Sequence, residues 1–70
     1  MRITYDHEVD ALYIMFKETK TTAKHIAEGI AADYDAEGRL AGIEILDALK
    51  RLGDKSAFKK ITLEDIALSS

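Results

Sequence analysis

Two short acidic segments hold the side chains of this sequence that could do chemistry. The first is Asp6-His7-Glu8-Val9-Asp10, and the second is Asp33-Tyr34-Asp35-Ala36-Glu37-Gly38. Each lies between two short apolar runs, so each is predicted to be a hairpin turn. Clustered carboxylate oxygens bind hard cations such as Ca²⁺ or Mg²⁺, and a histidine among them admits Zn²⁺. The candidate metal ligands are Asp6, His7, Asp10 and Asp35.

The same aspartates have a second interpretation. Asp6 and Asp35 stand at the beginning of their turns, where a carboxylate accepts hydrogen bonds from nearby backbone N–H groups. The spacing matches no established metal-binding loop, and turn capping is the more common role of such aspartates. The two interpretations predict opposite shifts of the carboxylate pKa. Crowded carboxylates have raised pKa values, and capping carboxylates have lowered ones.

Four apolar runs predict the strands that position these turns. They are residues 2–6, 11–16, 25–34 and 39–46, and no proline interrupts them. Residues 11–16 are apolar on both sides, which is typical of a central strand, and residues 17–24 are predicted to be a loop. In an up-and-down meander of these four strands, both acidic turns lie at the same end of the sheet, as a shared metal site requires.

The second hairpin can be placed in register. Gly38 is expected at positive φ, because only glycine escapes the Cβ penalty there. The turn then pairs Tyr34 with Leu40, Ala32 with Gly42 and Ile30 with Glu44. This register places Asp33 and Glu44 on opposite faces, which argues against a carboxylate pair for acid–base chemistry.

The pattern changes after Leu46. Asp47 is a good N-cap, and leucines at 46, 49 and 52 predict a short helix that Gly53 ends. Asp54 is expected to begin a second helical stretch. Residues 62–65 suggest one more short turn of helix, with a strand over residues 61–63 as the alternative. The predicted fold class is therefore α+β: a four-stranded, mainly antiparallel β-meander (1–46) followed by one or two short C-terminal helices (47–70), in a single domain.

The bulk composition favours self-association. The chain has 70 residues, no cysteine and a net charge of −3. A chain this short forms a marginal core, and without disulfides or thiolate metal sites the expected supplement is a homo-oligomer. No cofactor is expected. The predicted interface residues are Tyr13, Met15, Ile30, Tyr34 and Leu40.

The sequence also bears on location. It has no apolar run long enough to span a membrane and no signal-peptide pattern at its beginning, so we expect a cytoplasmic protein without a membrane partner.

Five spaced blocks carry a resemblance to a known family. They are Tyr5-Asp6, Asp10-Ala11-Leu12-Tyr13-Ile14, Asp33-Tyr34-Asp35, Gly38, and Gly42-Ile43-Glu44-Ile45-Leu46. Over residues 3–50 the chain resembles an uncharacterised prokaryotic family, domain-of-unknown-function family 2283. The resemblance implies a fold and no mechanism, because the family has no established activity. By analogy with small domains encoded beside toxin-like proteins, it suggests an antitoxin-like role.

Three functions follow as hypotheses. The first is a noncatalytic interaction module that acts as a homodimer or within a complex with another protein. The second is a metal-assisted hydrolase at the acidic turns. The third is a nucleic-acid-binding module that uses the basic residues between Lys50 and Lys60, although the net negative charge makes nucleic acid an unfavourable partner.

Overall fold

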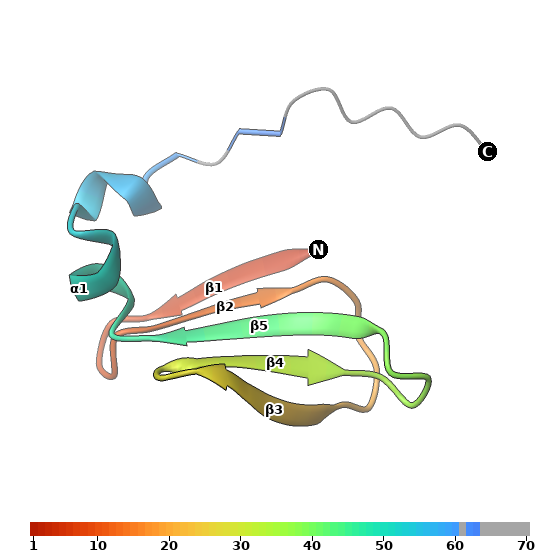
Figure 1. Ribbon diagram of the computed structural model, residues 1–70. Helices are drawn as coiled ribbons and strands as arrows, with labels where there is room; N and C mark the ends of the chain where they lie inside the picture. The colour runs from red at the N-terminus through yellow and green to blue at the C-terminus, as the bar shows by residue number, and fades with distance from the viewer. Residues whose placement is uncertain (61, 64–70) are drawn as a thin grey trace.

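A computed structural model describes residues 1–60 and 62–63 of the protein (Figure 1). This part of the chain forms one antiparallel sheet of five strands in the order β1-β2-β5-β4-β3, followed by two short helices. The elements are β1 (Arg2–Asp6), β2 (Ala11–Met15), β3 (Thr22–Ala27), β4 (Ile30–Tyr34), β5 (Leu40–Leu46), α1 (Ala48–Leu52) and the 3₁₀ helix η1 (Lys55–Phe58). The predicted α+β class and antiparallel sheet are confirmed, whereas the prediction of four strands is wrong.

The additional strand comes from the predicted run 25–34. A tight turn at Glu28-Gly29 divides this run into β3 and β4, and Gly29 has a φ of 75°. That backbone conformation is open to glycine at no steric cost, which allows a two-residue hairpin turn. β3 also begins earlier than expected, at Thr22, within the residues predicted to be a loop.

The strand order differs from the predicted meander. β5, the last strand in the chain, lies between β2 and β4, so β2 and β3 are not neighbours. Residues 16–21 instead cross the end of the sheet past β5 and β4, which is a Greek-key connection (Figure 1). The β1–β2 turn lies at the end where Ala11 pairs with Leu46, and the β4–β5 turn lies at the opposite end.

The register of β4 against β5 is only partly as predicted. Tyr34 pairs with Leu40, as expected, but the register then shifts so that Gly42 pairs with Asp33. Ala41 is the extra residue of this β-bulge. Past it, Glu44 pairs with Ala31 instead of the expected Ile30. A shift by one residue moves every later side chain to the other face of the sheet.

The sheet has two chemically different faces. Directly paired residues share a face and successive residues alternate, so the register of the strands assigns every paired side chain to a face. What we call the apolar face consists of Ile3, Tyr5, Leu12, Ile14, Thr22, Lys24, Ala27, Ile30, Ala32, Tyr34, Leu40, Ile43 and Ile45. The polar face consists of Arg2, Thr4, Asp6, Ala11, Tyr13, Met15, Ala23, His25, Ala31, Asp33, Gly42, Glu44 and Leu46.

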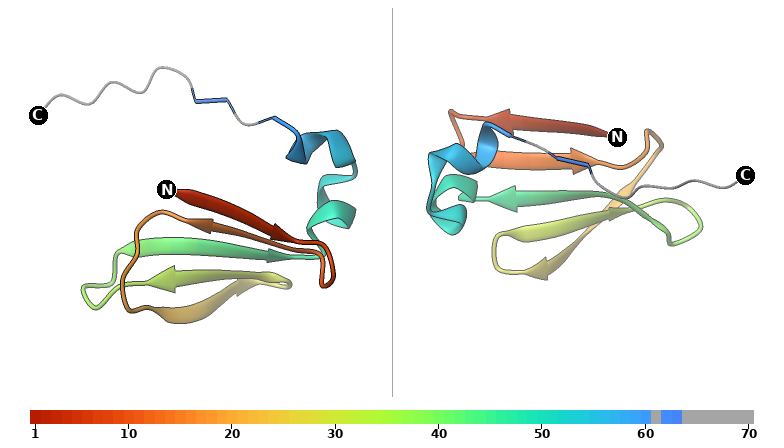
Figure 2. Two further views of the ribbon diagram at one scale, coloured as in Figure 1. Left: turned by 180° about the vertical axis from the view of Figure 1, so that it is seen from behind. Right: turned by 90° about the horizontal axis from the view of Figure 1, so that it is seen from above.

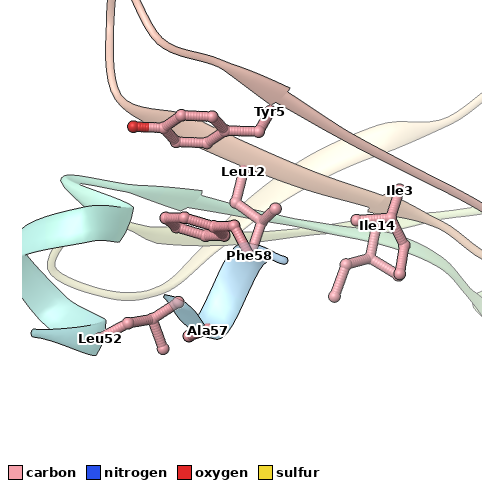
Figure 3. A pocket seen from close by; sticks show the side chains of 7 residues that line it. All are labelled: Ile3, Tyr5, Leu12, Ile14, Leu52, Ala57 and Phe58. Carbon is pink, nitrogen blue, oxygen red and sulfur yellow. The ribbon is translucent and has the colours of Figure 1, made fainter. Parts of the chain in front are cut away.

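The helices cover only one end of the apolar face. α1 and η1 lie at the end of the sheet that carries the β1–β2 and β3–β4 turns (Figure 2). The Phe58 ring stacks on the Tyr5 ring with 4.6 Å between centroids. Ile3, Ile14 and Leu52 border the apolar hollow of about 230 Å³ beside this stack (Figure 3).

The helix ends agree with the prediction in part. Gly53 ends α1 with a φ of 71°, and Asp54 caps η1 by accepting a hydrogen bond from the Ser56 N–H at 2.9 Å. The predicted N-cap is wrong, because Asp47 has a φ of 52° and its side chain makes no capping hydrogen bond. The predicted helical tail 47–70 is limited to α1 and η1 in the described residues. Thr62 and Leu63 are in neither a helix nor a strand, and the rest of the expected element at 62–65 lies outside the described residues.

Candidate functional site

The two aspartates of the first acidic turn accept hydrogen bonds from backbone N–H groups and from one hydroxyl. Asp6 accepts a hydrogen bond from the Glu8 N–H at 3.0 Å, so it caps its own turn as predicted. Asp10 accepts hydrogen bonds from the Tyr5 hydroxyl at 2.6 Å and the Leu49 N–H at 2.9 Å. The Tyr5 hydroxyl, followed by the backbone donors of α1, lowers the pKa of Asp10 below its ordinary value. Asp10 thus supplies the side-chain cap of α1 that Asp47 does not.

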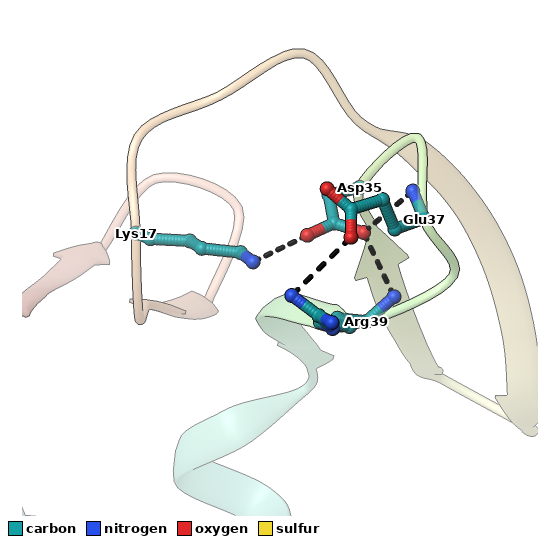
Figure 4. Close-up of polar contacts among 4 residues, drawn as sticks. All are labelled: Lys17, Asp35, Glu37 and Arg39. Carbon is teal, nitrogen blue, oxygen red and sulfur yellow. Dashed lines mark hydrogen bonds and ion pairs between the residues drawn. The ribbon is translucent and has the colours of Figure 1, made fainter.

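The second acidic turn is held by Asp35 (Figure 4). Its Oδ1 accepts hydrogen bonds from the backbone N–H groups of Glu37 at 2.9 Å and Arg39 at 2.8 Å, and its Oδ2 pairs with the Lys17 ammonium. The Lys17 ammonium, assisted by these N–H groups, lowers the pKa of Asp35 to about 2. Gly38 has a φ of 79°, which confirms the predicted turn. Lys17 lies in the connection from β2 to β3, so the pair fastens that connection to the β4–β5 turn.

The predicted metal ligands are not brought together. Asp6, His7 and Asp10 belong to the β1–β2 turn, and Asp35 lies at the opposite end of the sheet. The prediction of a common end is wrong because the turn at Glu28-Gly29 adds one more reversal of the chain between the two acidic turns. Within residues 1–60 and 62–63, no group of three or more histidine or carboxylate side chains is arranged to hold a metal ion.

A different polar cluster forms on the polar face. The Tyr13 hydroxyl donates a hydrogen bond to Asp33 Oδ2 at 2.5 Å, spanning β5 from β2 to β4. Gly42 lies beneath it: a Cβ atom there would approach the Tyr13 hydroxyl to 2.5 Å. Glu44, two residues along β5, faces the same side. The sequence prediction that Asp33 and Glu44 lie on opposite faces is wrong, and the cause is the bulge at Ala41.

The electrostatics of this cluster limit its chemistry. The hydrogen bond to Asp33, burial, and the negative charges of Asp33 and Glu44 raise the pKa of Tyr13 above its ordinary value. A phenol with a raised pKa keeps its proton near neutral pH, so Tyr13 acts as a hydrogen-bond donor and not as a base or nucleophile. The cluster can fasten β2 to β4 and present carboxylate oxygens on the polar face. The sequence signal for this cluster is a glycine, Gly42, that pairs with Asp33 and lies beside Tyr13. This signal can be recognised only once the register of the strands is known.

A family model decides the relationship of the chain to known proteins. The family described as "Protein of unknown function (DUF2283)" matches residues 2–48. The chain belongs to this family. The match covers all five strands of the DUF2283 sheet and ends at the first residue of α1. No curated protein and no solved structure matches the chain.

The basic residues beyond the DUF2283 match are partly engaged within the molecule. Arg51 donates hydrogen bonds to the backbone oxygens of Leu46 at 2.8 Å and Glu28 at 2.7 Å. These bonds join α1 to the end of β5 and to the β3–β4 turn. The remaining cations of the predicted nucleic-acid segment are exposed on α1, on η1 and just after η1; they are Lys50, Lys55, Lys59 and Lys60. No helix of the described residues is long and apolar enough to cross a membrane.

The predicted interface residues divide between the two faces of the DUF2283 sheet. Tyr13 and Met15 lie on the polar face, whereas Ile30, Tyr34 and Leu40 lie on the apolar face. A single flat contact with one partner therefore uses one of these groups. The apolar group lies over β4 and β5, beyond the part of the face that η1 covers.

Proposed function

We propose that this member of the DUF2283 family is a small noncatalytic interaction module that acts as a homodimer in the cytoplasm. The observation that carries the proposal is the absence of a filled core: in the described part of the chain, no large side chain is fully buried, and the buried hydrophobic residues are Ala32, Ala41 and Ala48. Burying one large apolar side chain contributes about 1.5–3 kcal/mol. A second chain that covers the open apolar side chains would add several such contributions.

The exposed side chains support the same proposal. Ile3 is 37% exposed and Leu40 is 42% exposed, and both belong to the apolar face. Scattered exposed hydrophobic residues are ordinary, but a contiguous apolar sheet face is typical of a protein-binding surface.

The absence of catalysis is part of the proposal. The polar cluster supports it, because Tyr13 retains its proton and Asp33 is occupied as the acceptor of the Tyr13 hydroxyl. Asp6, Asp10 and Asp35 of the acidic turns are likewise occupied by backbone N–H groups. No observation favours the metal-assisted hydrolase or the nucleic-acid-binding module over this reading. An antitoxin-like complex with another protein rests on the family analogy alone.

Sedimentation equilibrium of the full chain at about 1–100 µM tests the proposal. We expect the mass of two chains, with a thermal unfolding midpoint that rises with protein concentration because association stabilises the folded state by mass action. A mass of one chain across this range, with a midpoint independent of concentration, would contradict it.

A further inference from the structure

We infer that two copies of this chain join through their β1 strands, so that their sheets form one continuous sheet across a twofold axis. The inference rests on the proposed homodimer and specifies its contact. This surface differs from the one predicted from the sequence, whose residues lie on β2, β4 and β5. The feature that carries the inference is the order of residues in β1, which reads Arg2-Ile3-Thr4-Tyr5-Asp6.

β1 is an edge strand with an open outer side (Figure 1). It lies at one end of the strand order β1-β2-β5-β4-β3, and four of its five residues are exposed. On the side away from β2, an edge strand presents backbone N–H and C=O groups that no other strand of the described residues pairs. All five residues pair with β2 without a shift in register, so the outer edge is regular and suited to the addition of a further strand.

The charges of β1 are self-complementary in an antiparallel pair. A twofold axis at Thr4 places Arg2 opposite Asp6 of the second copy, and the same pair recurs on the other side of the axis. Opposite charges directly across a strand pair are stabilising, and like charges are destabilising. Within the described residues, neither Arg2 nor Asp6 belongs to an ion pair. Asp6 caps its own turn with Oδ1, which leaves Oδ2 to accept from a guanidinium.

The other face of the same strand pair is apolar. Ile3 and Tyr5 lie on the apolar face, and the axis at Thr4 places Ile3 opposite Tyr5 of the second copy. Pairs of an aromatic and a β-branched side chain stabilise neighbouring strands. Ile3 is 37% exposed in the single chain and borders the hollow beside Phe58. A second copy therefore covers apolar side chains that the single chain leaves open.

The opposite edge of the sheet lacks this complementarity. β3 carries Lys24 and His25 and no carboxylate over Thr22–Ala27, so a symmetric pair of β3 strands would bring no opposite charges together. Its register against β4 also shifts between His25 and Ala27. An edge lysine and an irregular register both oppose strand pairing between molecules. Of the two edges, β1 is the one that fits a second copy.

The size of the contact sets its expected strength. One strand pair is a small contact beside a standard interface, which removes roughly 800 Å² from each partner. In strand addition, main-chain hydrogen bonds supply the affinity and the side chains supply the specificity. We therefore expect a reversible dimer that dissociates on dilution, with a register fixed by the two pairs of opposite charges.

Two charge reversals test this register. Arg2→Glu places a negative charge opposite Asp6 of the second copy, and Asp6→Lys places a positive charge opposite Arg2. We expect each variant alone to self-associate at least about tenfold more weakly than the wild type, because two like-charged pairs replace two opposite ones. An equimolar mixture of the two variants should recover the dimer, because every charge then meets its opposite. Sedimentation equilibrium measures all of these samples.

The mixture distinguishes a contact between chains from an effect within one chain. Positions 2 and 6 lie about 13 Å apart along β1, and mixing changes neither chain, so recovery reports pairing between the two. Lys24→Glu on β3 is the control, because it changes the net charge as Arg2→Glu does and should retain the dimer.

Far-UV circular dichroism checks that each variant is folded. If Asp6→Lys does not fold because its turn cap is lost, Asp6→Asn keeps the capping oxygen. Added to Arg2→Glu, it removes the like-charged pairs and should recover part of the dimer.

The outcomes separate the inference from the proposed homodimer. Weakened association of folded Arg2→Glu, with recovery in the mixture or through Asp6→Asn and with Lys24→Glu dimeric, supports the inference. If the wild-type chain is dimeric and folded Arg2→Glu associates as tightly, if recovery fails, or if Lys24→Glu weakens the dimer as much, the inference is wrong while the proposed homodimer stands. If the wild-type chain is monomeric, both are wrong, and the β1 edge is left to a strand of another protein.

Discussion

Asp10 and Leu49 are joined across 39 residues of sequence by a 2.9 Å hydrogen bond from the Leu49 N–H to the Asp10 carboxylate. The helix α1 has only five residues and is too short to be stable alone. The β1–β2 turn supplies acceptors for the N–H groups at the start of α1, since the Ala48 N–H also donates to the backbone oxygen of Asp10 at 3.0 Å. The hairpin and the helix therefore depend on each other.

Removing this cap is expected to release α1. Asp10→Ala should lower the thermal midpoint by roughly 4–8 °C, since it removes the acceptor of both Leu49 and Tyr5 and leaves alanine at a φ of 53°. Asp10→Asn is the control, because asparagine keeps an acceptor oxygen and tolerates that backbone conformation. Hydrogen exchange measures the Leu49 amide directly. Equal protection of that amide in the wild type and in Asp10→Ala would refute the role.

Replacement of Gly42 is expected to displace Tyr13. A Cβ atom at position 42 would lie 2.5 Å from the Tyr13 hydroxyl and 3.0 Å from the Ile14 carbonyl oxygen. Gly42→Ala should reduce the free energy of unfolding by about 1–3 kcal/mol, the usual cost of overpacking. Denaturant melts of Gly42→Ala, Tyr13→Phe and the double variant form a cycle. Because the hydroxyl is the closest atom, Tyr13→Phe should cost less in the Gly42→Ala background, and strictly additive effects would contradict the contact.

Acid is expected to destabilise the fold. The pKa of Asp35 is lowered to about 2, chiefly by the Lys17 ammonium, and the pKa values of Asp10 and Asp54 are lowered as well. A lowered folded-state pKa means that the unfolded chain binds protons more readily, so these groups stabilise the fold above about pH 4 and lose that effect as the pH falls toward 2. Thermal midpoints measured at low salt from pH 7 to pH 2 should fall in that window. Asp35→Asn should flatten the decline, and a midpoint that rises on acidification would indicate repelling carboxylates instead.

Loss of Arg51 is expected to loosen the β3–β4 turn. Its guanidinium joins the backbone oxygens of Leu46 and Glu28, so Arg51→Met should reduce the free energy of unfolding by about 1 kcal/mol. Arg51→Lys should recover only part of this, because an ammonium lacks the planar fork that reaches two acceptors. Lys50→Met, at the exposed neighbouring position, is the control. Amide exchange at residues 28–30 that is unchanged in Arg51→Met would contradict the link.

Locally determined features were predictable from the sequence. The positive φ of Gly38, the end of α1 at Gly53 and the cap at Asp54 each depend on a few adjacent residues whose chemistry permits few alternatives. The turn at Glu28-Gly29 was missed because β3 is an exposed edge strand, and its residues Thr22–Ala27 lack the apolar alternation that marks a half-buried strand.

Features set by distant parts of the chain were not predictable in the same way. The bulge at Ala41 exists only once β4 and β5 are paired, and it decides that Asp33 and Glu44 share a face. Asp47 has a side chain suited to an N-cap, but its backbone is left-handed and its side chain makes no capping hydrogen bond. Asp10, in the distant β1–β2 turn, caps the helix instead. The candidate metal site failed because the missed turn between β3 and β4 adds a reversal of the chain, which places the two acidic turns at opposite ends of the sheet.

The placement of β5 in the middle of the sheet has a consequence for the order of folding. The β1–β2 and β3–β4 hairpins are each local and are complete in the chain before β5 begins, yet neither touches the other in the sheet. β5 contacts both, through pairs such as Ala11 with Leu46 and Ala32 with Ile43. Two-stranded hairpins are marginal on their own, and closure of the long β2–β5 loop is entropically slow. Insertion of the seven residues of β5 between two preformed hairpins is thus the step that turns two independent ribbons into one cooperative sheet.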